Sequence, residues 1–489
     1  MNILLGAPFP YRLVSPLGLG YLAVALRRAG HEVEIRNPNK GQDDPGGFAR
    51  WCRQRNFDVV GFQVMTSERG FTRALLSAVH EELPNALLLV GGPHISGRGA
   101  DALEDFEDAH YAFCGEAEES LPELLRLIDR THRPAPGKTL VHVPGLVYRT
   151  DEGIQKNPPV LIEDIDSLGP LPWDLFDIEG YNEDPGIMND EYPWYWIGTS
   201  RGCPHACAYC MNPVLNQGRI RYYKPQYVVD EIERMKKLGV PAVTLIDDTP
   251  TDDRGHFTEF CLELQRRVGI PWDVAGNATR LQTLDEELLQ LMERTGCRKV
   301  AVALESGSAK MIQRFRRDYD PWTAVARINE LAASTRMGFE VFFMLGHPDE
   351  TDADVLQTIR AILALEVDRI KVNMFSPWPG IAITKELERQ GRLPYVPDYL
   401  YYFDSAAMPT STISVRRLMF YQFLYYALFN LKPKRAYNLV RQFGIGNVLL
   451  TSTKLLLSAM GIERAVPGYM YKREYQASPH RQNGENRGK

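Results

Sequence analysis

The chain has 489 residues, of which 44% are hydrophobic and 24% charged, and its formal net charge is −6. That length suggests about three domains, and the composition is that of folded domains with ordinary cores. A negative chain provides no overall basic field, so we expect no nucleic-acid partner. No apolar run reaches the roughly 18 residues of a spanning helix, and the first residues lack the basic leader of a signal peptide. We therefore expect a cytoplasmic protein.

Residues 1–135 alternate short apolar strands with helical patterns. This alternation predicts an α/β fold with a doubly wound parallel sheet, a Rossmann-like domain that binds its ligand at the carboxyl ends of the strands. We expect helices over 18–29 and 69–83, and strands at Asn2–Gly6, Glu32–Arg36, Phe57–Gln63, Ala86–Gly92 and Tyr111–Cys114.

Two of those strand ends are unusual in sequence. Gly91–His94 (GGPH) closes one strand, and Gly115–Glu119 (GEAEE) closes the next. Paired glycines indicate a close approach of the backbone to a ligand, although an ordinary tight turn explains them equally well.

Residues 136–192 are dense in Pro, Gly, Asp and Glu, which predicts a linker. We expect a hairpin strand over 141–148, and a segment over 170–176 that packs across the first domain and leads into the next strand. The acidic stretch 181–192 is expected to form a mobile loop near the substrate entrance.

The stretch Thr199–Asn212 holds three of the seven cysteines, Cys203, Cys207 and Cys210, in the spacing C-x3-C-x2-C. Three soft thiolate ligands suit an iron–sulfur cluster in which one iron is free to bind a small molecule. A structural zinc site normally needs a fourth protein ligand, and nothing marks His205 as that ligand. A disulfide is disfavoured because no secretory signal precedes it.

This motif, with Tyr209 directly before the third cysteine, resembles that of the radical S-adenosylmethionine (radical SAM) superfamily. The resemblance implies a [4Fe–4S] cluster held by Cys203, Cys207 and Cys210. It also implies that the amino and carboxylate groups of S-adenosylmethionine (SAM) bind the free iron, with Tyr209 among the cofactor contacts. The motif follows an expected strand over 195–199, as it does in that superfamily.

Residues 193–395 repeat a strand-then-helix unit, which predicts a partial (β/α)6 barrel with its chemistry at the carboxyl ends of the strands. The segments 346–351 and 375–380 resemble later loops of the radical SAM barrel, the second of them near the adenine. By the same resemblance, other strand ends contact the SAM amino group, carboxylate and ribose: Asp247 and Asp248, Arg280, and Glu305 with Ser306, respectively.

The first domain resembles the cobalamin-binding domain found ahead of some radical SAM barrels. The signature Asp-x-His-x-x-Gly, which ligates cobalt from below, is absent, so the lower axial position stays unassigned and we expect base-off binding. His94 is equally well explained as a hydrogen-bonded loop histidine. The shared segments are Asp58–Gly61, Gly91–His94 and Gly115–Glu119, and the implied cobalamin contacts are Gly91, Gly92, His94, Gly115 and Glu116.

Residues 396–476 are predicted to form a helical, aromatic C-terminal domain, and residues 477–489 a disordered tail. The stretch 418–429 is apolar nearly all round, so we expect it to be buried as a helical cap over the barrel mouth. A lid or membrane-surface element for a greasy substrate is the alternative, because Lys432, Lys434 and Arg435 follow the apolar run.

Together these resemblances imply a cobalamin-dependent radical SAM enzyme, with methyl transfer as the favoured reaction. A 5′-deoxyadenosyl radical would abstract a substrate hydrogen, and methylcobalamin would deliver a methyl group to an unactivated carbon or to phosphorus. The substrate would be a small molecule, natural product or lipid-like compound, and a flavodoxin or ferredoxin would donate the electron.

Methyl transfer has three alternatives, two of which the sequence disfavours. The same two cofactors could close a ring on a porphyrin-like substrate or rearrange another ring. A methylthiotransferase is disfavoured, because the first domain holds only Cys52 and Cys114 where that class would carry a second cysteine trio. A non-catalytic cobalamin or cluster-binding sensor is disfavoured by the complete run of SAM-contact segments.

Overall fold

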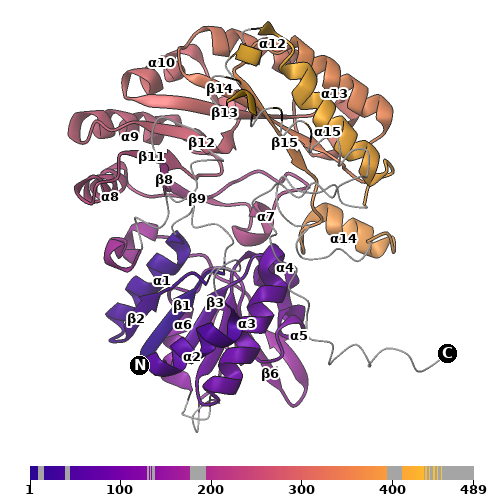
Figure 1. Ribbon diagram of the computed structural model, residues 1–489. Coiled ribbons are helices and arrows are strands. Elements are labelled where there is room, and N and C mark those ends of the chain that lie inside the picture. The colour runs from indigo at the N-terminus through magenta and orange to yellow at the C-terminus, as the bar shows by residue number, and fades with distance from the viewer. Residues whose placement is uncertain are drawn as a thin grey trace, which may run out of the picture.

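Two α/β units follow one another along the chain, each with its own sheet (Figure 1). The first sheet uses residues 2–156 and the second uses residues 194–374. The computed structural model describes residues 1–8, 16–38, 44–128, 132, 134, 138–176, 194–393, 410–433, 435–437, 440, 444–446, 449 and 453.

The first sheet has the strand order β2-β1-β3-β4-β5-β6-β7. Its first five strands are parallel, whereas β6 and β7 join as an antiparallel hairpin. That hairpin comes from a segment that the sequence assigned to the linker, so the sheet extends beyond residue 135. The strands are β1 (Asn2–Gly6), β2 (Glu32–Ile35), β3 (Val59–Gln63), β4 (Leu87–Gly91), β5 (Tyr111–Phe113), β6 (Leu146–Thr150) and β7 (Gly153–Lys156).

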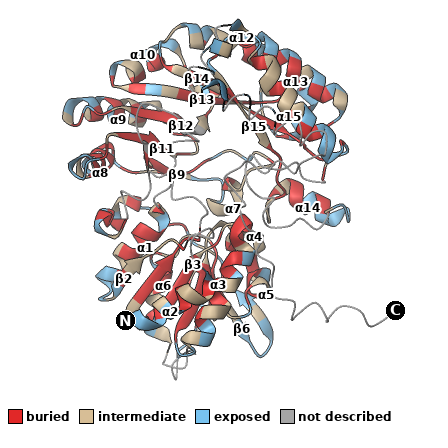
Figure 2. Cartoon of the chain, in the orientation of Figure 1, coloured by how far each residue is buried: buried red, intermediate tan, exposed pale blue. Residues whose placement is uncertain are grey.

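Helices cover both faces of this sheet, which confirms the doubly wound arrangement. Successive strand residues point to opposite faces, so Leu4 packs against α2 and α3 while Leu5 packs against α1 and α6. Both side chains are buried, as are the interiors of both sheets in Figure 2. The helices are α1 (Leu17–Arg28), α2 (Pro45–Arg55), α3 (Arg69–Glu82), α4 (Pro93–Arg98), α5 (Ala102–Asp105) and α6 (Ser120–Leu127).

The second sheet consists of six parallel strands in the order β15-β14-β13-β12-β11-β8, as the partial barrel requires. Its strands are β8 (Trp194–Ile197), β11 (Ala242–Leu245), β12 (Trp272–Thr279), β13 (Cys297–Glu305), β14 (Gly338–Leu345) and β15 (Arg369–Met374). The helices around it are α8 (Pro225–Lys237), α9 (Arg254–Arg267), α10 (Glu286–Arg294), α11 (Ala309–Arg314), α12 (Pro321–Ala333), α13 (Asp352–Ala364) and α14 (Ala382–Arg389).

The segment 170–176, which precedes β8 in the chain, packs against the barrel as well as against the first unit. The Trp173 indole donates to the buried carboxylate of Glu231 on α8 at 2.6 Å. Phe176 lies so close to α1 that a Cβ at Gly20 would come within 2.6 Å of its ring. The segment is therefore an apolar wedge between α1 and α8. The acidic stretch 181–192 lies outside the described residues.

Helix α4 of the first unit meets the loop between β15 and α14 of the second through two glycines. A Cβ at Gly97 would lie 2.3 Å from the carbonyl oxygen of Pro379, and one at Gly380 would lie 2.8 Å from that of Gly97. Gly380 also has a φ of +85°, which favours glycine. The two backbones can approach this closely only without side chains.

The C-terminal part contains helix α15 (Val415–Phe429), which packs on α13 and β15 and buries Leu418, Tyr425 and Phe429. Lys432 pairs with Glu366, and Arg435 donates to the Leu365 carbonyl at 2.6 Å. These two cations therefore bind within the protein. No helix among the described residues is long and apolar enough to cross a membrane. The tail and most of the predicted C-terminal helices lie outside the described residues.

Gly97→Ala should lower the free energy of unfolding by about 1–3 kcal/mol, because its methyl group would collide with a backbone oxygen that cannot swing away. Urea denaturation measures the change. Gly255→Ala is the matched control, since its methyl group would meet only Asp253 at 3.5 Å on the surface of α9. Equal stabilities for the two variants would contradict the close contact between the units.

Candidate functional site

The cysteine loop starts from a short antiparallel ribbon of β9 (Ser200–Gly202) and β10 (Ile220–Tyr222). The last residue of β9, Gly202, has a φ of +94°, and a Cβ there would lie 2.1 Å from the Arg219 carbonyl oxygen. Glycine therefore lets the chain turn directly into Cys203. The loop ends at the short helix α7 (Asn212–Leu215).

The three thiols are in different surroundings. Cys203 is buried, whereas Cys207 and Cys210 are partly exposed. Burial raises the pKa of Cys210 to about 12, although the Asn212 amide donates to its sulfur at 3.4 Å. Among the described residues, no three His, Cys, Asp or Glu side chains gather as ligands of a single metal ion would. Cluster thiolates bind different iron atoms, so they need not surround one point.

Asp247 at the end of β11 anchors the start of the cysteine loop rather than facing a cofactor. Its buried carboxylate accepts the Thr199 amide at 2.9 Å and the Ser200 hydroxyl at 2.5 Å. Asp248 is partly exposed and accepts a hydrogen bond from the Asn212 side chain. Burial, together with the neighbouring charge of Asp247, raises the pKa of Asp248 to about 6. Of the two carboxylates at this strand end, that of Asp247 is bound within the protein, whereas Asp248 is partly exposed and its contact with SAM stays a prediction.

Tyr209 belongs to a buried polar group behind the cysteines. Its hydroxyl donates to Glu305 at 2.5 Å, and the Arg317 guanidinium lies 3.2 Å from the same carboxylate oxygen. Burial, followed by the charge of Glu305, raises the pKa of Tyr209 well above its ordinary value. Arg317 escaped the sequence analysis, because a run of arginines after a short helix resembles an exposed face. The Ser306 hydroxyl is also hydrogen-bonded within the protein, to the Thr358 hydroxyl at 2.9 Å.

Arg280 follows β12, where the sequence places it, and pairs with Asp318 at 3.1 Å. The Arg280 side chain is only 11% exposed, whereas that of Asp318 is 70% exposed, so the partner can swing into solvent. Two strand-end hydroxyls, of Thr279 and Ser376, are buried without a hydrogen-bond partner. Since buried polar groups are almost always hydrogen-bonded, these oxygens fit a polar ligand such as SAM.

A cavity of about 260 Å³ opens at the carboxyl ends of β1, β3, β4 and β5. It lies at the switch point of the first sheet, where β1 and β3 are adjacent. The helix after β1 covers one face of the sheet, and the helix after β3 covers the other. Gly61 and Gly91 line it, and a Cβ at either would make only ordinary contacts of 3.5 Å or more. Gly92 and Gly115 also line it, and both have positive φ angles. The residues fit a large ligand that needs room against the strand ends.

His94 does not face this cavity, so the predicted cofactor contact is not supported. It is 1% exposed, and its ring nitrogens lie 3.1 Å from the Thr66 hydroxyl and 3.3 Å from the Asp105 carboxylate. Burial lowers the pKa of His94, although hydrogen bonding to Asp105 opposes this. His94 is therefore a hydrogen-bonded histidine, the alternative that the sequence left open, although it lies in helix α4 rather than in a loop.

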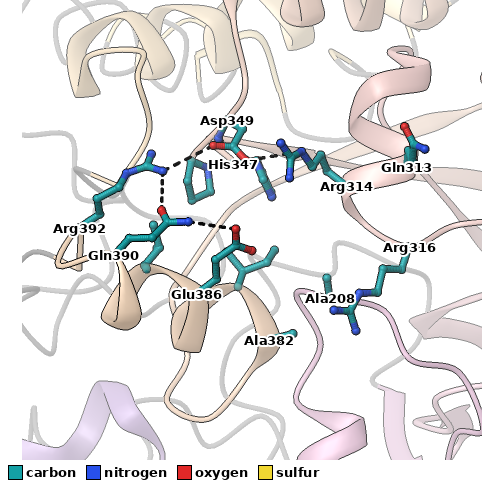
Figure 3. A pocket seen from close by; sticks show the side chains of 13 residues that line it. Ala208, Gln313, Arg314, Arg316, His347, Asp349, Ala382, Glu386, Gln390 and Arg392 are labelled. Atoms are coloured by element: carbon teal, nitrogen blue, oxygen red, sulfur yellow. Dashed lines mark hydrogen bonds and ion pairs between the residues drawn. The ribbon is translucent and has the colours of Figure 1, made fainter.

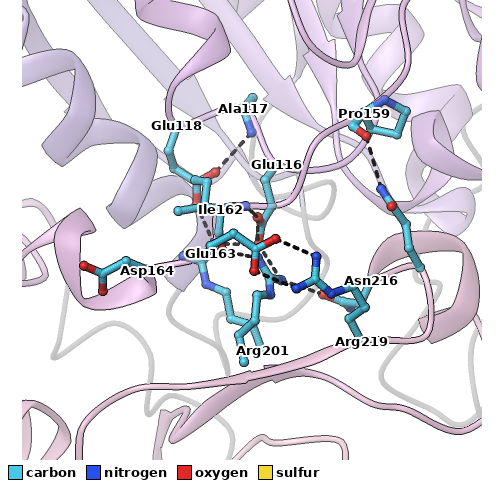
Figure 4. Close-up of polar contacts among 12 residues, drawn as sticks. Glu116, Ala117, Glu118, Pro159, Ile162, Glu163, Asp164, Arg201, Asn216 and Arg219 are labelled. Atoms are coloured by element: carbon cyan, nitrogen blue, oxygen red, sulfur yellow. Dashed lines mark hydrogen bonds and ion pairs between the residues drawn. The ribbon is translucent and has the colours of Figure 1, made fainter.

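Glu116 lines the same cavity, but its carboxylate joins the two units (Figure 4). It lies 2.7 Å from Arg221 and 3.0 Å from Arg201, the latter also bound to Glu118 at 2.8 Å. It also accepts the Ile162 amide at 2.7 Å. Burial alone would raise the pKa of Glu116, but the two arginines hold it below its ordinary value. Glu116 is thus a positioning residue rather than a free cofactor contact.

A second cavity, of about 730 Å³, lies between α4 of the first unit and the cysteine loop of the second. Ser96 and Gly115 line both cavities and are joined by a 2.9 Å hydrogen bond. Cys207 and Cys210 line the far side of the larger one. The two cavities therefore adjoin at Ser96 and Gly115, and together they make up the gap between the cysteines and the strand ends of the first sheet.

Each of the two units matches the model of a known protein family. Residues 10–125 match the model of the B12 binding domain, and residues 197–362 match that of the Radical SAM superfamily. An uncharacterized methyltransferase of Pyrococcus horikoshii is 25% identical over 75% of this chain and 76% of its own length. The anaerobic magnesium-protoporphyrin IX monomethyl ester cyclase of Cereibacter sphaeroides is 27% identical over 77% of this chain and 60% of its own length.

A solved structure shares the arrangement of both units. The cobalamin-dependent SAM radical enzyme OxsB, with aqua-cobalamin and SAM bound, superposes with a TM-score of 0.68. The match covers 94% of this chain and 72% of that chain, at 14% sequence identity. This likeness confirms the fold, with a B12-binding unit ahead of a radical SAM barrel.

Replacing Cys203, Cys207 or Cys210 with Ala should abolish iron–sulfur absorbance and SAM cleavage, because two thiolates hold a cubane poorly. Iron content and 5′-deoxyadenosine production measure the loss. Cys52→Ala and Cys261→Ala are the matched controls, since both thiols are buried in helices away from the loop. Normal iron content in all three loop variants would rule out the assignment.

Arg280→Ala should weaken SAM binding by about 1.5–3 kcal/mol, since it removes a charge-assisted hydrogen bond to a carboxylate. Asp318→Asn should leave SAM affinity unchanged or improve it, because it removes the carboxylate that competes for Arg280. Equilibrium dialysis with labelled SAM measures both, with iron content as the control. Equal dissociation constants for wild type and Arg280→Ala would remove Arg280 from the site.

Proposed function

Because this chain belongs to the cobalamin-binding radical SAM enzymes, we propose that it transfers a methyl group to an unactivated carbon, or to phosphorus, of a small-molecule, natural-product or lipid-like substrate. The observation that carries the proposal is the gap between the two units. One end of that gap is the glycine-lined cavity at the strand ends of the B12-binding unit, and the other is formed by Cys207 and Cys210. A substrate in the gap would face both cofactors.

The residues present fit each cofactor. Cys203, Cys207 and Cys210 would hold a [4Fe–4S] cluster, and Arg280, Thr279 and Ser376 offer polar atoms to SAM. Gly61, Gly91, Gly92 and Gly115 would leave room for cobalamin. When bound, the cluster with SAM supplies a hydrogen-abstracting radical, and cobalamin supplies the methyl group.

The protein's own contribution is positioning. Asp247 holds Thr199 and Ser200 at the entry to the cysteine loop. Glu116 fixes the loop's ribbon to the strand ends of the B12-binding unit through Arg201 and Arg221. Reacting groups held at a set separation and shielded from water react without a further cost of orientation. These residues would therefore set the distance over which the methyl group moves.

A ring-forming reaction is the second candidate, because one relative is an anaerobic cyclase at 27% identity. Products distinguish the two reactions. Incubation with SAM that carries a labelled methyl group should place the label in the product of a methyltransferase. A cyclase would instead form an unlabelled product that has lost hydrogen.

We also propose a flavodoxin or ferredoxin as the electron donor and the cytoplasm as the location, because the cluster needs a low-potential reductant and a reducing compartment. Contact of the C-terminal part with a membrane surface stays a prediction, since most of that part lies outside the described residues.

Gly91→Trp should abolish cobalamin binding and methyl transfer, because the indole would occupy the cavity. The backbone at Gly91 has room for a Cβ, so the substitution should not strain the strand. The Cβ would meet only Phe113, at 3.7 and 3.9 Å. Gly92 is a poorer site for this test, since its φ of +97° would strain any side chain. Cobalamin is measured by absorbance, and methyl transfer by label in the product.

Val141→Trp is the control, because it adds the same side chain at a position that is 58% exposed. Both variants should keep the iron–sulfur cluster, and uncoupled SAM cleavage should persist in both. Full methyl transfer by cobalamin-free protein would overturn the proposed function.

A further inference from the structure

The large cavity between the two units is lined by positive charges and by no negative ones among the described residues. The charged residues that line it are all cationic: Arg98, Lys156, Arg316 and Lys385. None of the described residues that line it is acidic, although the whole chain carries a net charge of −6. Arg98 and Lys156 come from the B12-binding unit, whereas Arg316 and Lys385 come from the barrel. Docking of the two units therefore assembles this positive lining.

Three of these four cations are not neutralised by the protein. Arg98 is paired, since its Nε lies 2.8 Å from the Asp105 carboxylate. Lys156, Arg316 and Lys385 form no side-chain ion pair or hydrogen bond within the part of the chain that the structure describes. All three side chains belong to exposed residues at the cavity. Their charges remain available to a ligand.

Arg316 is held at this position by a strained backbone. Helix α11 ends at Arg314, and Arg316 then adopts a φ of +58°, the left-handed conformation in which glycine is preferred. Its amide donates to Gln313 at 3.0 Å, and the next amide donates to Ile312 at 3.0 Å, which closes the helix end. A non-glycine residue in this conformation costs energy that a glycine would save. Glycine would suit this backbone conformation better, so the property that distinguishes arginine here is its charged side chain.

A smaller cavity of about 200 Å³ adjoins the large one and shares Arg316 and Ala382 with it (Figure 3). Its other arginines, Arg314 and Arg392, both lie near Asp349, at 3.5 and 3.7 Å. Glu386 also lines it. Because two carboxylates offset two of its three cations, this smaller cavity is a weaker anion site than the large one.

We propose that the substrate of this enzyme carries an oxyanion group, a phosphoryl or carboxylate group, which Arg316, Lys385 and Lys156 bind in the gap between the units. This inference rests on the proposed function for the identity of the gap as the substrate site. The cations lie on the same cavity as Cys207 and Cys210. An anion held by them would position the remainder of the substrate between the cluster loop and the B12-binding unit.

The experiment uses the reconstituted full-length protein and ligand-observed NMR. Methylphosphonate (31P) and acetate (13C) are the phosphoryl and carboxylate probes, and dimethyl methylphosphonate is the neutral probe. One or both anions should show saturable line broadening that weakens with added salt, with further broadening when the cluster is reduced and paramagnetic. The neutral diester should show none. The anion with the lower dissociation constant identifies the phosphoryl or carboxylate class.

Arg316→Gly is the decisive variant, because it removes the guanidinium and relieves the left-handed strain at the same position. We expect an equal or higher melting temperature, and an anion dissociation constant raised about tenfold or more, as for loss of a charge-assisted contact. Lys156→Gln and Lys385→Gln should each raise it about threefold. Lys237→Gln, an exposed lysine on α8, is the control and should leave it unchanged.

Each contrary outcome has a distinct meaning. Unchanged anion binding in all three variants would overturn the oxyanion site, even if the protein still cleaves SAM and binds cobalamin. Loss of cobalamin or a weaker SAM affinity in Arg316→Gly would also overturn it, because the cation would then serve a cofactor. Anion binding that depends on these residues in a protein that never cleaves SAM would instead contradict the proposed function and leave the anion site standing.

Discussion

The structure depends on the ionic contact between Glu116 and the ribbon that carries the cysteine loop. Arg201 precedes Cys203 by two residues, and Arg221 lies opposite it on β10. Both guanidiniums bind the carboxylate at the end of β5. A buried ion pair adds little net stability compared with a hydrophobic contact, but loss of one partner leaves an uncompensated charge. Its main effect is therefore to join the ribbon of the cysteine loop to the strand ends of the B12-binding unit, beside the cavity that Cys207 and Cys210 line.

Both sheets could be predicted from the sequence because their strands are short, continuous apolar runs separated by helical patterns. The elements that escaped prediction carry weak local signals. Helix α2 has two glycines directly after its first residue, Pro45, and buries few apolar side chains, among them Phe48 and Cys52. Strands β9 and β10 are only three residues long, so no periodicity can develop. The β6–β7 hairpin was predicted only in part: the expected hairpin strand over 141–148 overlaps the start of β6, but the stretch was assigned to a linker, because its pairing with β5 is a tertiary contact.

The candidate site was predictable as a set of strand ends, but not in the orientation of individual side chains. Asp247, His94 and Glu116 each lie at a predicted position, and each side chain is committed to the protein itself. Sequence patterns show where polar residues occur and not which groups they meet. The two arginine partners of Glu116 are 85 and 105 positions away, so no local pattern could reveal them. Conversely, Arg317 and Arg316 gained importance only when the fold brought them beside Glu305 and the cavity.

Two of the left-handed residues that are not glycine lie close together in the chain, between the end of β13 and the turn after α11. Glu305 and Arg316 both adopt left-handed φ angles, +61° and +58°, although neither is a glycine. Such conformations persist only where the surrounding contacts enforce them. At Glu305 the turn directs a carboxylate toward Tyr209 and Arg317, behind the cysteines. At Arg316 it directs a guanidinium to the cavity in front of them. The segment from the end of β13 to the turn after α11 thus places a compensated buried charge against Tyr209 of the cluster loop and an uncompensated cation on the cavity that Cys207 and Cys210 line, and only the second is available to a ligand.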